Sequence, residues 1–125
     1  MIKSNNNSNY PCTLYIVRHG ETNWNVMGRI QGQSDSELTE KGIQDTKILA
    51  RRLKDIHFDA IFSSDLSRAS KTAELIRLDR DLAIETHEAL RERTFGIHDG
   101  DYSSDYTLAI QDLLKEYETL SVEEK

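Results

Sequence analysis

The chain has 125 residues, of which 37% are hydrophobic and 30% are charged, and its formal net charge is −6 at pH 7. This size and balance are typical of one globular domain, and the acidic charge argues against a general nucleic-acid-binding protein, which usually carries a basic face. The single cysteine, Cys12, excludes an internal disulfide and favours a cytoplasmic location, and no apolar run approaches the roughly 20 residues that span a membrane.

The start of the chain is polar and rich in asparagine, without the apolar centre of a secretory signal. We expect a disordered tail over residues 1–10 and one domain over residues 11–125. Residues 14–17 form a continuous apolar run, which is typical of a strand buried on both faces. Residues 23–36 show no clear period and contain two glycines, so we expect a loop there.

Helical and strand patterns alternate along the rest of the chain. Thr39 is a favourable N-cap, and apolar residues recur at helical spacing from Ile43 to Ile56, which predicts a helix. The alternation implies βαβ units and a mainly parallel sheet. The other expected elements are, in order, a strand at 59–63, a helix capped by Ser64 or Asp65, a weaker strand at 82–86, a loop at 88–102 and a helix capped by Ser103 or Ser104.

His19 is the residue with the strongest chemical signal. It lies between Arg18 and Gly20, directly after the apolar run, and α/β sheets place their ligand crevices at the carboxyl ends of strands. The arginine offers a planar fork of donors that suits phosphate oxygens, and the glycine allows the backbone to approach a ligand closely. This combination predicts a nucleophilic histidine in an anion-binding pocket.

The residues around His19 extend this signal into a longer motif. The stretch Arg18-His19-Gly20-Glu21-Thr22-Asn23-Trp24-Asn25, followed by Gly28-Arg29-Ile30-Gln31-Gly32, resembles the histidine phosphatase superfamily, which includes the phosphoglycerate mutases. Three further blocks match in order, at residues 35–42, 63–74 and 90–96. The resemblance implies a three-layer α/β/α fold with a mainly parallel, phosphoglycerate mutase-like sheet.

The resemblance also implies roles for particular residues. His19 is expected to form a phosphohistidine, and Glu92 is expected to act as general acid for the leaving group. Arg18 and Arg68 are expected to hold the phosphoryl oxygens, since charge spreads over these oxygens in the transition state. The expected catalytic residues are His19, Glu92, Arg18 and Arg68. The expected substrate-binding residues are Arg18, Gly20, Glu21, Thr22, Asn25, Gln31, Gly32 and Arg68.

Each of these residues also has an ordinary structural interpretation. Arg18 and Arg68 would then be solvated surface charges, and Glu92 would belong with Glu88 to an exposed helical face. We expect no cofactor and no metal, because His57, His87 and His98 lack metal-ligand spacing and no glycine-rich nucleotide loop is present. The expected ligand is a small phosphorylated substrate, and we expect neither nucleic acid nor membrane as a partner.

One departure from the family pattern stands out. The family is expected to carry a second His-Gly pair on a later strand that lies between its first two strands, and no such pair follows Gly20 in this chain. We therefore expect a partial, C-terminally truncated domain without the later strands. Residues 14–17 and 60–63 should be separated by a gap or should pair directly and distort the pocket, and unpaired strands favour self-association.

Three functions are open at this point. The first is hydrolysis of phosphomonoesters through phospho-His19, impaired by the truncation. The second is a non-catalytic relative that binds phosphorylated ligands or a partner chain. The third is phosphotransfer of the phosphoglycerate mutase type.

Overall fold

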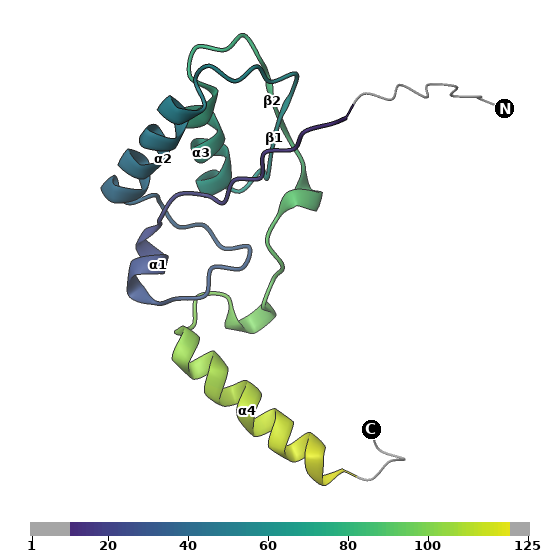
Figure 1. Cartoon of the computed structure of the whole chain (residues 1–125). Coiled ribbons are helices and arrows are strands. Elements are labelled where there is room, and N and C mark those ends of the chain that lie inside the picture. The colour runs from purple at the N-terminus through teal and green to yellow at the C-terminus, as the bar shows by residue number, and fades with distance from the viewer. Residues whose placement is uncertain (1–10, 121–125) are drawn as a thin grey trace, which may run out of the picture.

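The computed structural model describes residues 11–120, and the tail expected at residues 1–10 lies outside this range. Figure 1 shows the course of the chain. Its helices and strands are α1 (Asn23–Met27), α2 (Glu40–Arg52), β1 (Ile61–Ser63), α3 (Ser67–Arg77), β2 (Ile84–Thr86) and α4 (Ser103–Thr119), with short 3₁₀ turns η1 (Glu88–Leu90) and η2 (Gly96–His98) before α4.

The described residues form a small parallel sheet with helical cover. β1 and β2 pair in parallel, with Ile61 opposite Ile84 and Ser63 opposite Thr86. The connecting helix α3 packs on both strands, and α2 packs against α3, so the two helices lie together beside the sheet (Figure 1). The expected α/β architecture with parallel strands is therefore present. Within residues 11–120 it consists of the two-stranded sheet and one layer of helices beside it.

The strand expected at residues 14–17 is absent from the structure, and this prediction is wrong. The segment takes part in no strand ladder within residues 11–120, and β1 pairs with β2 only. Leu14 is 78% exposed and Ile16 is 92% exposed. A buried strand needs neighbours that satisfy its backbone groups, and here no neighbouring strand supplies them. Of the two outcomes expected for this segment, the structure has separation from β1 rather than direct pairing.

This separation leads to a prediction for amide hydrogen exchange. We expect residues 14–17 to exchange orders of magnitude faster than the amides of α2, because unprotected amides open without unfolding the domain. The measurement is exchange on the purified chain, with sedimentation velocity as the control for self-association through these exposed apolar residues. Slow, cooperative exchange at residues 14–17 in a monomer would contradict this prediction.

Two expected helix starts and one expected loop also differ from the structure. Residues 23–36 contain the short helix α1, because Thr22 and Asn25 form a reciprocal capping box. The third helix begins at Ser67 rather than beside Ser64 or Asp65, and the Ser64 hydroxyl instead accepts a hydrogen bond from the Leu66 amide at 3.2 Å. The last helix begins at Ser103, but Tyr102 is its N-cap and no side chain caps it.

Other expected features are confirmed. The Thr39 hydroxyl accepts from the Gly42 amide at 3.0 Å and caps α2, which ends at Arg52 rather than Ile56. The expected strands at 59–63 and 82–86 are present as the shorter β1 and β2. The expected loop at 88–102 is irregular apart from η1 and η2.

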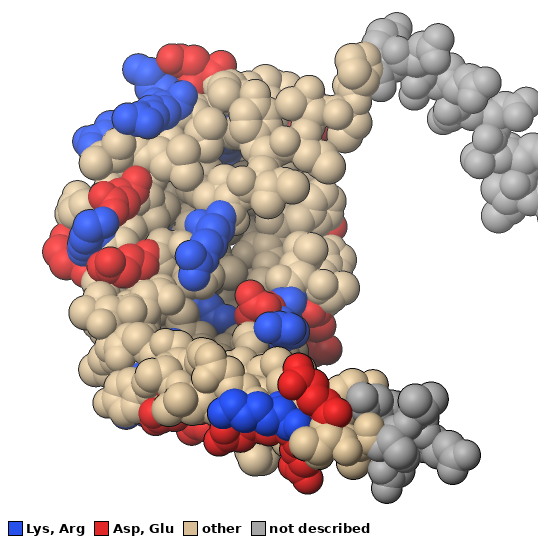
Figure 2. All heavy atoms as spheres, turned by 60° about the horizontal axis from the view of Figure 1, so that its bottom comes forward, with Lys and Arg blue, Asp and Glu red and all other residues tan. Residues whose placement is uncertain are grey.

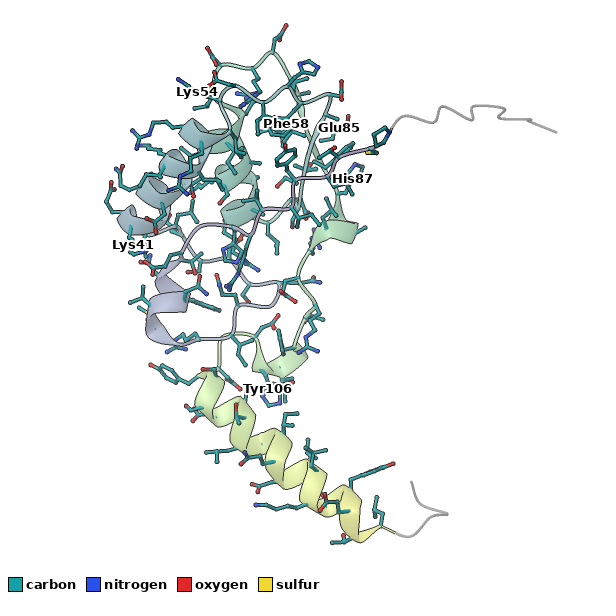
Figure 3. The ribbon with its side chains drawn as sticks, in the orientation of Figure 1. Lys41, Lys54, Phe58, Glu85, His87 and Tyr106 are labelled. Atoms are coloured by element: carbon teal, nitrogen blue, oxygen red, sulfur yellow. The ribbon has the colours of Figure 1, made fainter. Side chains whose placement is uncertain are left out.

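The interior of the described region is small and partly polar. Its buried hydrophobic residues are Ala50 and Leu53, and buried threonines and serines fill much of the space between α2, α3 and the loops. The helix α4 extends away from the other elements (Figure 1), and Leu113 is 58% exposed on it. At its start, Tyr106 (labelled in Figure 3) packs edge-on against the rings of Phe95 and His98 in the η2 region.

Candidate active site

The turn that carries His19 is locked against the helices by close backbone contact. A Cβ atom at Gly20 would lie 2.9 Å from the Gly42 carbonyl oxygen, and one at Gly42 would lie 2.2 Å from the Glu21 carbonyl oxygen. These contacts require glycine at both positions, because any side chain would push the turn away from α2. On the other side, the Gly20 amide donates to the Thr72 hydroxyl of α3 at 3.0 Å.

This turn presents one ring nitrogen of His19. The Nδ1 atom lies 2.7 Å from the Gly20 carbonyl oxygen, which can only accept a hydrogen bond. Nδ1 therefore carries the proton, and the lone pair of the neutral imidazole is on Nε2. A histidine in this tautomer has the nucleophilic nitrogen that attack on phosphorus requires.

The surroundings of His19 keep its imidazole neutral. Burial lowers the pKa of His19 below the ordinary value of 6.5, and the hydrogen bond to the Gly20 carbonyl raises it in part. The positive charges of Arg68 and Arg18 lower this pKa further, whereas the Glu92 carboxylate raises it. Arg68, Arg18 and Glu92 thus lie near enough to His19 to influence its pKa.

The lowered pKa predicts a shifted acid limb in the pH dependence of phosphoryl transfer. The protonated imidazole has no free lone pair, so the rate should rise with pH as His19 loses its proton. Because the pKa lies below 6.5, half of the maximal rate should be reached below pH 6.5. The check is a pH titration of the His19 ring protons by NMR beside the pH–rate profile, and a midpoint at or above 6.5 would contradict it.

Arg68 is buried beside this histidine and holds the loop that faces it. Its side chain is 3% exposed, and its guanidinium donates to the carbonyl oxygens of Gly32 and Ser34, each at 2.7 Å. Burial lowers the pKa of Arg68 and Asp35 raises it, but guanidinium groups stay protonated in proteins. Arg68 therefore supplies a fixed positive charge and orders residues 32–34. Arg18, in contrast, is exposed.

Glu92 is more exposed than is usual for a general acid that keeps its proton at neutral pH. A general acid at neutral pH is favoured by partial desolvation, yet Glu92 is exposed in the structure. Its Oε1 atom accepts from the Arg93 amide at 2.9 Å, and its carbonyl oxygen accepts from the Gln33 side chain at 3.2 Å. The carboxylate remains near enough to His19 and Arg68 to influence the pKa of each.

Several residues expected to bind substrate form hydrogen bonds with one another or with nearby loop residues. Thr22 is fully buried and its hydroxyl donates to the Gln31 side-chain oxygen at 2.8 Å, while its amide donates to the Asn25 side-chain oxygen at 3.0 Å. The Glu21 carboxylate accepts from the Thr39 hydroxyl at 2.8 Å at the start of α2. These contacts shape the loops around His19, and direct contact of these side chains with a substrate stays a prediction.

Asp99 and Thr72, which are not among the expected site residues, support the loops around His19. Asp99 accepts from the Gln33 amide at 3.2 Å and from the Phe95 amide at 2.9 Å, and it lies against Gly32, whose φ is +51°. Thr72 anchors the turn at Gly20. Hydrophobic periodicity does not reveal the role of Asp99, because that role depends on its contact with Gln33, which is 66 residues away in the sequence.

Residues 11–120 contain no group of three or more His, Cys, Asp or Glu side chains that could hold a metal ion. Within the same range, no helix combines the length and apolar character that crossing a membrane requires. Figure 2 shows acidic and basic side chains intermixed on the face turned forward, with neutral surface between them.

The chain is similar to known phosphatases and mutases. Residues 14–121 match the sequence model of the histidine phosphatase superfamily (branch 1). A probable phosphoglycerate mutase GpmB from Yersinia pestis (strain Pestoides F) is 46% identical over 84 residues, which are 67% of this chain and 39% of that protein. The chain thus spans about two-fifths of the length of the curated relatives that it matches.

Solved structures give the same result. A phosphoglycerate mutase from Bacillus anthracis str. Sterne aligns with a TM-score of 0.74 at 36% identity, over 85% of this chain and 50% of that one. A phosphoserine phosphatase from Entamoeba histolytica, solved with 3-phosphoglyceric acid, aligns with a TM-score of 0.64 at 40% identity, over 71% and 44%. The family match covers most of the chain, so the chain belongs to the histidine phosphatase superfamily, branch 1.

Proposed function

We propose that this chain hydrolyses phosphomonoesters through a phosphohistidine at His19. The observation that carries the proposal is the state of His19, whose Nδ1 is occupied by the Gly20 carbonyl while Arg18, Arg68 and Glu92 act on its ring. A neutral imidazole beside two guanidinium groups suits attack on an anionic phosphoryl group, because the cations offset the charge repulsion. The substrate class is a small phosphorylated molecule, as the names of the Bacillus and Entamoeba relatives support.

The proposed reaction has two steps. In the first, Nε2 of His19 forms a bond to phosphorus as the bond from phosphorus to the leaving oxygen breaks, and Glu92 donates a proton to that oxygen. In the second, water attacks the phosphohistidine, the phosphorus–nitrogen bond breaks and the Glu92 carboxylate accepts the proton of the water. The products are an alcohol and inorganic phosphate.

One feature of the chain, the loop of residues 31–35, favours hydrolysis over mutase chemistry as the proposed reaction. The loop of residues 31–35 looks closer to broad phosphatases than to glycolytic mutases, and Arg68 holds it against the site through Gly32 and Ser34. A mutase would return the phosphoryl group to a bound ligand and would release little inorganic phosphate. We expect turnover slower than that of a full-length relative, because this chain has no second His-Gly pair.

The test is phosphate release by the purified chain from p-nitrophenyl phosphate and from 3-phosphoglycerate, with acid-labile phosphate on the protein measured in parallel. Release together with labelling supports a phosphatase, and conversion of 3-phosphoglycerate to an isomer without release supports a mutase. Binding of inorganic phosphate, seen as NMR shifts at His19, without labelling or turnover would support a non-catalytic relative and overturn the proposal.

A further inference from the structure

An ion pair outside the proposed catalytic set joins the two segments that carry Arg68 and Glu92. The Arg91 side chain donates from Nε to the Asp65 Oδ1 atom at 2.7 Å and from Nη2 to Oδ2, so the contact is bidentate. Glu88 is a second, weaker partner of Nη2 at 3.2 Å. Both main partners are about two-thirds covered, with side-chain exposures of 28% for Arg91 and 32% for Asp65.

The positions of the two partners in the chain make this contact informative. Asp65 lies between the end of β1 and the start of α3, three residues before Arg68. Arg91 directly precedes Glu92 and follows η1. The pair therefore bridges 26 residues of sequence and ties the start of α3 to the loop after β2. A bidentate arginine fixes both distance and orientation, whereas a lysine at the same site acts as a point charge.

The Glu92 side chain has no comparable anchor of its own. It is exposed, and the hydrogen bond of its carboxylate in the described structure is to the amide of the next residue, Arg93. That local contact does not relate Glu92 to His19 or to Arg68. The relation must come from the backbone of its loop, which is held by the Asp65–Arg91 pair and by the exposed hydrogen bond from the Gln33 side chain.

We propose that Asp65 and Arg91 are positioning residues, whose bidentate ion pair holds the Glu92 carboxylate at its working distance from His19 and Arg68. Neither residue belongs to the proposed catalytic set, and the pair acts through the backbone of residues 91–92. The kinetic consequence rests on the proposed function of Glu92 as general acid. The structural consequence does not, because it concerns only the distance between Glu92 and His19.

The structural test is the pH titration of His19 by NMR in the chain and its variants. Among the charges that act on the pKa of His19 are those of Arg68, Arg18 and Glu92. Glu92→Gln should lower the His19 midpoint by a few tenths of a pH unit, the scale for charges several Å apart near water. Asp65→Asn should lower it in the same direction, because Glu92 moves away when the pair is broken.

A double variant separates positioning from a general loss of structure. If the pair acts through Glu92, Asp65→Asn should cause no further change in the His19 midpoint in a chain that already carries Glu92→Gln. Arg91→Lys keeps the positive charge but loses the bidentate contact with Asp65. It should therefore lower the His19 midpoint by part of the amount seen in Asp65→Asn. Asp45→Asn breaks an exposed ion pair with Lys41 on α2 and is the matched control, with no expected shift. Additive shifts, or an unchanged His19 midpoint in Asp65→Asn, would overturn the proposal.

The kinetic test compares leaving groups. An alkyl phosphate needs a proton on its leaving oxygen, whereas p-nitrophenyl phosphate needs it far less. Asp65→Asn should slow alkyl phosphate hydrolysis by up to about 10²-fold, the cost of a displacement of about 1 Å, and should spare the aryl phosphate. Equal slowing of both substrates would contradict positioning. If the chain releases no phosphate at all, the proposed function fails, and the NMR result still decides the positioning role.

Discussion

Replacing His19 with asparagine should abolish phosphorylation of the chain and reduce phosphomonoester hydrolysis by at least about 10³-fold, because no other group can form the covalent intermediate. Asparagine keeps a polar side chain of moderate size in the half-buried position, so the turn at Gly20 should persist. The measurements are the rate of phosphate release from p-nitrophenyl phosphate and the site of acid-labile phosphate, located by mass spectrometry.

The matched control for this variant is His57→Asn. His57 is a histidine with an 87% exposed side chain, and its ion pair with Asp59 lies outside the site, so its replacement should leave labelling and rate unchanged. A His19→Asn chain that still hydrolyses the ester at a similar rate would exclude the phosphohistidine route. Labelling that disappears only in the His57 variant would place the nucleophile elsewhere.

Replacing Arg68 with alanine should have the second largest effect, on both rate and stability. The change removes the donors to the Gly32 and Ser34 carbonyl oxygens, and each buried acceptor left without a partner costs about 1–3 kcal/mol. It also removes a positive charge next to His19, for which a loss of about 10²–10³ in rate is the usual scale. Urea unfolding and the rate of phosphate release measure the two effects.

Two further variants make the Arg68 result specific. Arg68→Lys keeps the positive charge but cannot reproduce both hydrogen bonds to the Gly32 and Ser34 carbonyl oxygens. Compared with Arg68→Ala, it should therefore recover part of the rate and a smaller part of the stability. Arg52→Ala, at the exposed end of α2, should change the free energy of unfolding by no more than about 0.5 kcal/mol and should leave the rate of phosphate release unchanged. An Arg68→Ala chain as stable as the parent would mean that the contacts to residues 32–34 do not hold the loop in solution.

Local chemistry explains why much of the site can be predicted from the sequence. The motif from Arg18 to Asn25 places a histidine, a guanidinium and a glycine within a few residues, and such a pattern can be recognised without knowing its tertiary contacts. The same holds for Thr39, whose hydroxyl caps α2 through an interaction that spans only three residues. Hydrophobic periodicity likewise places α2, α3 and α4 to within a few residues.

Contacts between distant segments are what the sequence does not reveal. The burial of Arg68 depends on carbonyl groups 34 and 36 residues away, and the Asp65–Arg91 pair spans 26 residues, so neither follows from a local pattern. Asp99 supports Gln33 in the same long-range manner. A guanidinium or carboxylate is polar in every window of sequence, and only its partners decide whether it is a surface charge or part of a site.

The segment at residues 14–17 shows most clearly which properties follow from the sequence and which depend on tertiary structure. Its amino acids alone determine that it is apolar and that a histidine follows it. Whether it becomes a strand depends on another strand that satisfies its backbone, and within residues 11–120 β1 is paired with β2 instead. The sequence by itself therefore determined the family, the motif around His19 and most helices. Tertiary structure alone decided strand pairing, the burial of Arg68 and the surroundings of His19, because these depend on groups that only folding brings together.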